Sequence, residues 1–257
     1  MRPVPRTRWL AVLLALGAVI SVRPAASAAG EAPARQTLFI GIDTSGSFQR
    51  AGYGDALGFL ALYIYGHLEG LGGLERPREL FVAPVGGREP DEPKAFRPLH
   101  DFAGKTAAQI EADLRAWFPP TDTLTDFNAF FRRVAQIVKE RNLLLRPVTI
   151  LIVTDGVPDV SPGAAPAGSP EAYRAIDLAP LEYLARRVTL RLAYPTPPVA
   201  ERWRTLVPRQ RVRLWTVDDV VMRGWRAQFA PAEEPVAQVR FWKWVRDNVD
   251  VRARRRT

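Results

Sequence analysis

The stretch TLFIGIDTSGS at residues 37–47 decides the fold class that this sequence predicts. Its first part, Thr37–Ile42, is short and almost continuously apolar, which is typical of a strand covered on both faces. The strand ends abruptly at Asp43, and Ser45 and Ser47 follow it. A carboxylate and two hydroxyls are hard oxygen donors, the ligands that Mg²⁺ or Mn²⁺ takes. This D-x-S-x-S pattern is weak by itself, so its meaning depends on what the fold brings beside it.

A second predicted strand ends in the same way. Residues 148–154 are apolar and β-branched, and Asp155 opens a D-G turn directly after them. The preceding segment, residues 126–141, predicts a helix because its apolar residues recur on one face. This helix runs away from one edge of the sheet and the strand returns to it, so Thr125 and Asp155 reach the same edge. Asp43 arrives there on its own parallel strand, and three separate segments converge on one site.

Strands and helices alternate along the rest of the chain. We expect further helices at residues 55–71, 106–118, 178–187, 199–206 and 236–249, and further strands at residues 80–85, 95–102, 188–193 and 211–217. Strands 80–85 and 95–102 flank a polar turn and predict a hairpin. The predicted fold is therefore α/β, with a doubly wound, mostly parallel sheet, one antiparallel edge strand and helices on both faces.

In order, spacing and context these motifs resemble the von Willebrand factor A (vWA) domain, a Rossmann-like fold. Its metal-ion-dependent adhesion site (MIDAS) is built from D-x-S-x-S, a Thr, and an Asp that opens a D-G turn. The resemblance implies an Mg²⁺ or Mn²⁺ site in which Ser45, Ser47 and Thr125 bind the metal directly, while Asp43 and Asp155 act chiefly through bound water. It also implies a protein-binding module, not an enzyme, whose partner completes the metal coordination with an acidic side chain. The resemblance covers roughly residues 36–227.

Several alternatives stay open at the level of sequence. Thr123 rivals Thr125 as the threonine ligand, and Ser45 and Ser47 could instead cap the turn that follows them. A structural envelope protein with this fold and no functional metal is one alternative function. A metal-dependent hydrolase or phosphatase with Asp43 as nucleophile is another, although no general acid or phosphate-holding loop is evident beside it. An aspartic protease needs Gly directly after Asp-Thr, and this chain has Ser45 there.

Composition narrows the function further. The formal net charge is +9, but four of the 36 Lys and Arg residues lie within residues 1–28 and four within residues 252–257. The remaining cations nearly balance the 27 acids, which argues against nucleic-acid binding. The absence of Cys excludes disulfides and thiolate metal sites. We interpret His67 and His100 as packing or surface residues, and most of the five tryptophans between residues 203 and 244 as packing residues.

The two ends of the chain predict export and a basic tail. Residues 1–28 combine a basic start, an apolar run and small residues at Ala26 and Ala28, as in a signal peptide of the general secretory route. We expect a linker at 29–36, the vWA-like domain at 37–230, and a C-terminal amphipathic helix with a basic tail at 231–257. The protein would then be periplasmic or extracellular, and its tail would contact anionic membrane surfaces weakly.

Overall fold

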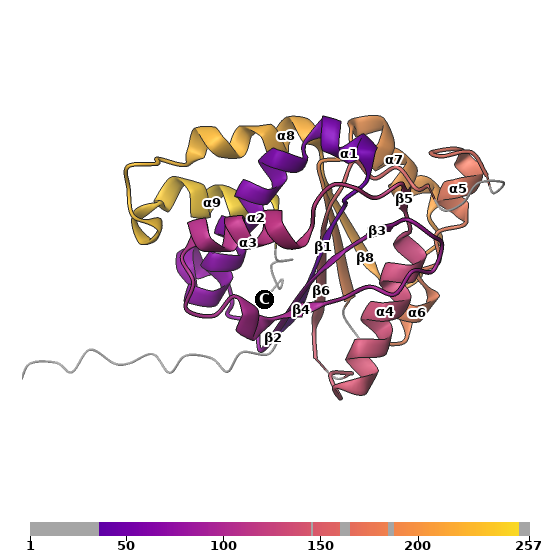
Figure 1. Cartoon of the computed structure of the whole chain (residues 1–257), viewed down its shortest axis with the longest axis horizontal. Coiled ribbons are helices and arrows are strands. Elements are labelled where there is room, and N and C mark those ends of the chain that lie inside the picture. The colour runs from indigo at the N-terminus through magenta and orange to yellow at the C-terminus, as the bar shows by residue number, and fades with distance from the viewer. Residues whose placement is uncertain (1–35, 145, 160–164, 185–187, 252–257) are drawn as a thin grey trace, which may run out of the picture. The chain divides into compact units, whose positions relative to one another are not determined.

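A six-stranded sheet in the order β4-β2-β1-β6-β7-β8 organises the computed structural model (Figure 1), which describes residues 36–251 except 145, 160–164 and 185–187. The strands are β1 (Thr37–Ile42), β2 (Glu79–Pro84), β4 (Arg97–Pro98), β6 (Val148–Val153), β7 (Val188–Ala193) and β8 (Arg213–Val217). Neighbouring strands are parallel except β4, which lies antiparallel to β2 at the edge. The predicted mostly parallel sheet with one antiparallel edge strand is confirmed.

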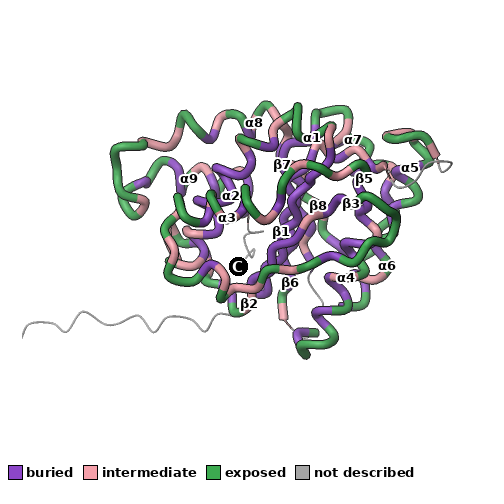
Figure 2. Tube along the Cα trace, in the orientation of Figure 1, coloured by how far each residue is buried: buried purple, intermediate pink, exposed green. Residues whose placement is uncertain are grey.

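Helices cover both faces of the sheet, because its strands are apolar on both sides. In β1 the side chains of Leu38, Ile40 and Ile42 join one hydrophobic cluster and Phe39 joins the other. The first cluster is closed by α1 (Gly46–Ala51), α2 (Tyr53–Glu69), α3 (Ala107–Trp117), α8 (Asp219–Arg223) and α9 (Val239–Asn248). The second is closed by α4 (Phe127–Glu140), α5 (Pro170–Arg174), α6 (Ala179–Glu182) and α7 (Pro197–Leu206). The sheet is therefore buried between two layers (Figure 2).

Local signals set the ends of the best-predicted helices. At the start of α3 the Thr106 side chain accepts the Gln109 N–H, and the Gln109 side chain accepts the Thr106 N–H, which satisfies two backbone donors reciprocally. At the start of α4 the Asp126 carboxylate accepts the N–H of Ala129 at 2.9 Å. The buried residues of α4 include the whole apolar face that the spacing predicts. These two helices match their predicted ranges within about one residue.

The structure corrects the predicted hairpin at residues 80–102. The ladder between β2 and β4 is limited to Phe81 opposite Pro98 and Val82 opposite Arg97. The chain after β2 instead forms β3 (Gly86–Gly87), which pairs with β5 (Leu124–Thr125) in a separate two-stranded sheet. The helix expected at 178–187 is the short α6, and none of α1, α5 and α8 was predicted. Short 3₁₀ helices join the larger elements at η1 (Leu71–Gly73), η2 (Leu99–Asp101), η3 (Gly224–Gln228) and η4 (Pro235–Ala237).

The C-terminal helix belongs to the same core as the sheet, as expected for an amphipathic helix that closes the fold. Phe241, Trp242 and Val245 of α9 are buried in the cluster that contains α2, within one compact unit at Ala34–Thr257. The predicted signal peptide, the linker up to residue 35 and the basic tail from residue 252 lie outside the described residues. In the part of the chain that is described, no helix combines the length and apolarity needed to span a membrane.

Candidate metal centre

The carboxyl ends of the parallel strands meet at one edge of the sheet, and backbone hydrogen bonds hold them there. The N–H of Asp43, just after β1, donates to Val153 at the end of β6 at 3.0 Å, and the N–H of Thr154 donates to Ala193 at the end of β7 at 3.0 Å. The loops that carry Asp43 and Asp155 therefore leave adjacent strands. Their placement follows from the strand order alone, as the switch-point rule for open α/β sheets requires.

The loop after β1 buries Asp43 and Ser45, while Ser47 is exposed. Asp43 is 0 % exposed, and its Oδ1 accepts the backbone N–H of Ser45 at 3.0 Å. The hydroxyls of Ser45 and Ser47 are 3.2 Å apart. Ser45 stands at the N-cap position of α1, yet its side chain makes no capping hydrogen bond. The capping explanation therefore does not account for Ser45, and its hydroxyl is left facing that of Ser47.

Asp155 brings a second carboxylate to this loop. It follows β6, and its Oδ1 accepts the N–H of Val157 at 3.0 Å. Burial, and then the nearby charge of Asp155, raise the pKa of Asp43 to about 6. Within the described ranges, no Lys, Arg or His side chain forms an ion pair with either carboxylate. The site thus holds two acids in close proximity, and in the described part of the chain neither is ion-paired with a side-chain cation.

Thr154 orients Asp43, a role that the sequence analysis missed. Its hydroxyl donates to Asp43 Oδ2 at 2.6 Å and accepts the N–H of Gly156 at 2.9 Å. Both oxygens of Asp43 are therefore held by the chain. Gly156 has a φ of +77°, in the left-handed region that favours glycine, and its carbonyl accepts the indole N–H of Trp203 at 2.8 Å. Trp203 is 0 % exposed, so a buried side chain of α7 fixes the D-G turn.

Thr125 reaches the same edge through its backbone. The backbone of Thr125 pairs with Gly86 of β3 on one side and with Asp159 on the other. Its N–H donates to the Asp159 carbonyl at 2.8 Å. Thr125 is 1 % exposed, and among the described residues its hydroxyl has no hydrogen-bond partner. Thr123 is exposed, and its hydroxyl donates to the Arg88 carbonyl at 3.5 Å. Thr125 is buried, whereas Thr123 is exposed and hydrogen-bonded to a carbonyl, and this difference favours Thr125 over Thr123 as a ligand.

Two further contacts at this edge were not predicted. The Thr44 hydroxyl donates to the Asp122 carboxylate, which ties the loop after β1 to the segment before β5. Tyr194 follows β7 with a φ of 80°, an uncommon conformation for an aromatic residue. Its ring packs edge-on against Phe48 of α1, and its hydroxyl donates to Asp55 at 2.7 Å. No sequence pattern marks either contact, because each joins residues that only the fold brings together.

The donor set suits a hard divalent cation. Two carboxylates and three hydroxyls are oxygen ligands, and the carboxylates together match a charge of +2. The described part of the chain contains no group of three or more His, Cys, Asp or Glu side chains able to hold a metal. It therefore contains no metal site built from three such ligands. His67 is buried with its Nδ1 2.8 Å from the Glu75 carbonyl, and His100 is exposed beside Asp101. Neither histidine belongs to this edge.

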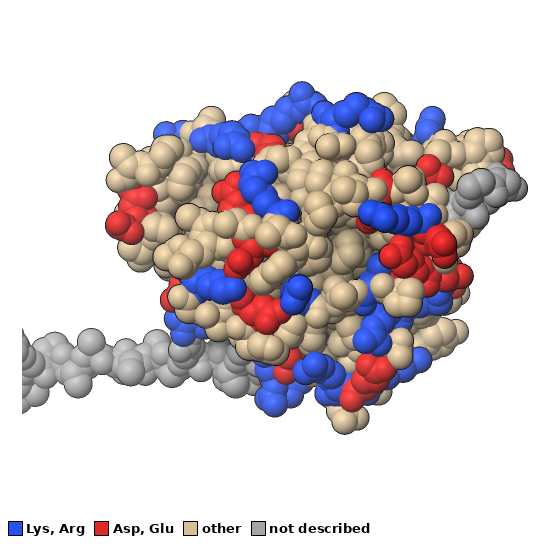
Figure 3. All heavy atoms as spheres, in the orientation of Figure 1, with Lys and Arg blue, Asp and Glu red and all other residues tan. Residues whose placement is uncertain are grey.

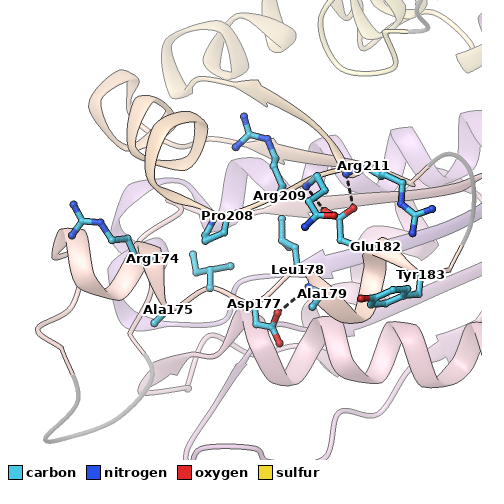
Figure 4. Close-up of a pocket in the computed structure, with 12 residues that line it drawn as sticks. Arg174, Ala175, Asp177, Leu178, Ala179, Glu182, Tyr183, Pro208, Arg209 and Arg211 are labelled. Carbon is cyan, nitrogen blue, oxygen red and sulfur yellow. Dashed lines mark hydrogen bonds between the residues drawn. The ribbon is translucent and has the colours of Figure 1, made fainter.

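A separate hollow of about 280 Å³ lies elsewhere, between the α5–α6 segment and the residues that lead into β8 (Figure 4). At its floor the Glu182 carboxylate accepts backbone N–H groups of Gln210 at 2.7 Å and Arg211 at 2.5 Å. Glu182 therefore pins a loop and is already satisfied. The hollow contains none of the five predicted ligands, so the edge with Asp43 and Asp155 is a surface site distinct from it.

The comparisons with known proteins concern the fold. No protein-family model matches the chain, and no curated protein matches it in sequence. The SpRpn10 VWA domain is 8 % identical, covering 80 % of this chain and 94 % of that one, with a TM-score of 0.41. The human COPII-coat protein Sec24c is 13 % identical over 77 % and 31 %, with a TM-score of 0.45. Mussel byssus proximal thread matrix protein 1, solved with a zinc-occupied MIDAS motif, is 12 % identical over 75 % and 46 %, with a TM-score of 0.39. The chain spans less than half of these last two proteins and is similar in fold to all three.

Proposed function

We propose that this chain is an exported vWA-type module that binds Mg²⁺ or Mn²⁺ at the edge formed by Asp43, Ser45, Ser47, Thr125 and Asp155. The observation that carries the proposal is the Asp43–Asp155 pair: two neighbouring carboxylates, one of them fully buried, with no partner cation among the described side chains. A divalent cation supplies the missing charge. The hydroxyls of Ser45, Ser47 and Thr125 would bind it directly, and the two aspartates chiefly through water.

The proposed use of the metal is to hold an acidic group of another protein. Bound there, the cation offers an open coordination position to a carboxylate of the partner. Neighbouring residues of this chain hold and orient the two aspartates. Thr154 and the Ser45 N–H fix Asp43, and Trp203 fixes the turn that Asp155 opens. Neutral hydroxyls leave the charge of the cation available to the partner, since they neutralise none of it.

We assign no catalytic group to this edge. A hydrolase that used Asp43 as its nucleophile would need this carboxylate to attack a substrate directly, but the residue is 0 % exposed, whereas the proposed contact of Asp43 with the metal is made through water. Export is proposed from residues 1–28, by the general secretory route, to the periplasm or beyond the cell. On the face that Figure 3 shows, Lys and Arg are interspersed with Asp and Glu, and this mixture does not favour nucleic acid as a partner.

Thermal unfolding with and without metal tests the proposal. Mg²⁺ at ten times its dissociation constant should raise the free energy of unfolding by about 1.4 kcal/mol and the Tm by a few degrees. Asp43→Ala should lose this rise. Asp159→Ala removes a carboxylate four residues after Asp155 and outside the ligand set, so it should keep the rise.

The compared quantity must be the metal-induced difference, because Asp43→Ala also removes a buried charge and can stabilise the metal-free protein. An equal rise in the parent and in Asp43→Ala would overturn the metal site. The alternative of a structural envelope protein without a functional metal would then replace it.

A further inference from the structure

An arginine without an acidic partner lies over the D-x-S-x-S loop. Arg50 is one turn after Ser47 in α1, and its Nη1 comes within 3.9 Å of the point where a Cβ on Gly46 would lie. The guanidinium group therefore folds back toward the peptide between the two serine ligands. Arg50 is exposed, and among the described residues it makes no ion pair or hydrogen bond. Its charge at the rim of the site is not neutralised.

A second such arginine lies on the side of Asp155. Arg202 precedes Trp203, the residue whose indole holds the D-G turn, so this turn of α7 faces the loop after β6. Its Nη1 donates to the Gly168 carbonyl at 2.8 Å, and its guanidinium carbon is 5.8 Å from the centre of the Tyr173 ring. Both contacts are with uncharged groups. In the described ranges Arg202 forms no ion pair, although its side chain is exposed.

The charges around the site are therefore uneven. Arg50 and Arg202 lie on the α1 and α7 side, where Figure 3 shows Lys and Arg along the upper edge of the view. On the β5 side stand two acids. The backbone N–H of Asp122 donates to the Thr44 carbonyl at 3.1 Å, which places Asp122 beside the loop after β1. Asp159 pairs with Thr125 through its backbone. A partner that lies across the site meets cations on one side of the metal and acids on the other.

From this asymmetry we infer that the partner offers an acidic segment: one carboxylate at the metal and at least one more beside it, directed toward Arg50 and Arg202. The inference rests on the proposed function and adds the partner's chemistry to it. Two ionised aspartates match the divalent cation, and a bridging carboxylate adds one negative charge. The two guanidinium groups add two positive charges on the α1 and α7 side, where neither forms an ion pair within the described part of the chain, so this side can hold a flanking acid. Arginine suits this role because its planar fork binds carboxylates with two parallel hydrogen bonds.

Two labelled peptides test the inference on the full chain. The first carries a single aspartate among glycines and serines, and the second adds a glutamate on each side of it. Fluorescence polarisation measures the Kd of each with Mg²⁺ and with EDTA, at two salt concentrations. Both peptides should need Mg²⁺, and the flanked peptide should bind about three- to ten-fold more tightly, as expected for one or two exposed ion pairs. Salt should shrink that ratio.

Arginine variants assign the preference to its residues. Arg50→Gln and Arg202→Gln should each lower the ratio of the two affinities, the double variant should bring it close to one, and Arg50→Lys should keep part of it. Arg213→Gln is the matched control, since Arg213 is an exposed arginine at the start of β8, on the opposite edge of the sheet. The Mg²⁺-induced rise in Tm shows that each variant is folded with an intact metal site.

The outcomes separate this inference from the proposed function. Equal Mg²⁺-dependent affinities for both peptides, or a preference that survives in the double variant, would overturn the inference and leave the metal site standing. A preference that persists in EDTA would show charge attraction without the metal and would also overturn it. Failure of both peptides to bind in Mg²⁺ would contradict the proposed function, and the inference with it.

Discussion

Asp43 is a carboxylate with no exposed surface, hydrogen-bonded at both oxygens and placed beside a second carboxylate. Burial and the charge of Asp155 disfavour its ionised form more than the N–H of Ser45 and the hydroxyl of Thr154 favour it. In the metal-free protein this residue therefore costs stability when it is charged. A bound divalent cation reverses the balance, because it favours the ionised form.

This residue predicts how stability depends on pH. The pKa of Asp43 is about 6 in the folded protein, against 3.8 as the ordinary value. Between these values the folded protein keeps a proton that the unfolded chain has lost, so its free energy of unfolding falls as pH rises through this interval. The fall is at most about 3 kcal/mol for two pKa units.

Urea unfolding in EDTA, from pH 4 to pH 7.5, measures this dependence. The fall should be present in the parent and absent from Asp43→Asn, which holds no titrating group at this position. Mg²⁺ should stabilise the parent more as pH rises through about 6, since the ion needs the ionised carboxylate. A parent and an Asp43→Asn variant with parallel pH profiles would contradict the assignment of this pKa.

At this scale the sequence predicts which residues come to the edge but not how each is held. The order of strands and helices is enough to place Asp43 and Asp155 on adjacent loops. The hydroxyl of Thr154 and the carboxylate of Asp122 escape prediction, because their partners are 111 and 78 residues away along the chain. Thr125 is supported over Thr123 only by burial, and burial is a property of the folded chain.

Elements position the site by packing against the loops that carry it. The D-G turn after β6 is fixed from α7, through the bond from the Trp203 indole to the Gly156 carbonyl. The Gly156 Cα also lies against α7, since an added Cβ would come within 2.9 Å of Val199 and 3.1 Å of Trp203. Five tryptophans late in the sequence predict packing, and Trp203, Trp225 and Trp242 are buried as expected.

Removal of this anchor should weaken both stability and metal binding. Trp203→Phe leaves the buried Gly156 carbonyl without its donor, which should lower the free energy of unfolding by about 2 kcal/mol. It should also raise the Kd for Mg²⁺, because Asp155 loses a fixed turn. Trp215→Phe is the control: this indole is 42 % exposed, and its N–H donates to Asn248 far from the site.

Urea unfolding and Mg²⁺ titration of the two variants decide the point. If Trp203→Phe and Trp215→Phe changed the Kd for Mg²⁺ equally, the turn would not depend on α7.

Elements were predictable where one segment carries a long, regular pattern. The apolar face of α4, the capping box of α3 and the β-branched run of β6 each lie within a single stretch of chain. The pairing of β3 with β5 was not predictable, since two-residue strands have no periodicity and their partners are distant. Pro98 in β4 lacks the N–H that a longer ladder would need, which explains why the predicted hairpin is confined to two residue pairs.

At the scale of the whole molecule, helix α9 and Asp250 close the core. Arg191, in the middle of β7, donates to the Asp250 carboxylate, and both side chains are at least 95 % buried. The Tyr63 hydroxyl of α2 lies 3.4 Å from the same guanidinium group. The pair joins the sheet, α2 and the chain after α9. Sequence could not predict it, because an isolated arginine within a strand gives no sign of its partner.

Breaking this pair should destabilise the whole unit. Asp250→Ala leaves a guanidinium group buried without its carboxylate, which should cost about 3–5 kcal/mol. Asp247→Ala removes an acid of α9 that pairs with Lys243 and is about half exposed, so it should cost less than about 1 kcal/mol. Urea unfolding compares the two variants. Similar losses in both would show that the C-terminal segment does not close the core.

The most direct measurement of the central claim is anomalous diffraction from crystals of this protein grown with Mn²⁺. We predict the strongest peak between the hydroxyls of Ser45, Ser47 and Thr125, beside Asp43 and Asp155, and its loss in crystals of Asp43→Ala. The same map distinguishes Thr125 from Thr123 as the threonine ligand. A map with no peak at this edge at millimolar Mn²⁺, or with an unchanged peak in Asp43→Ala, would contradict a metal site built on the D-x-S-x-S loop.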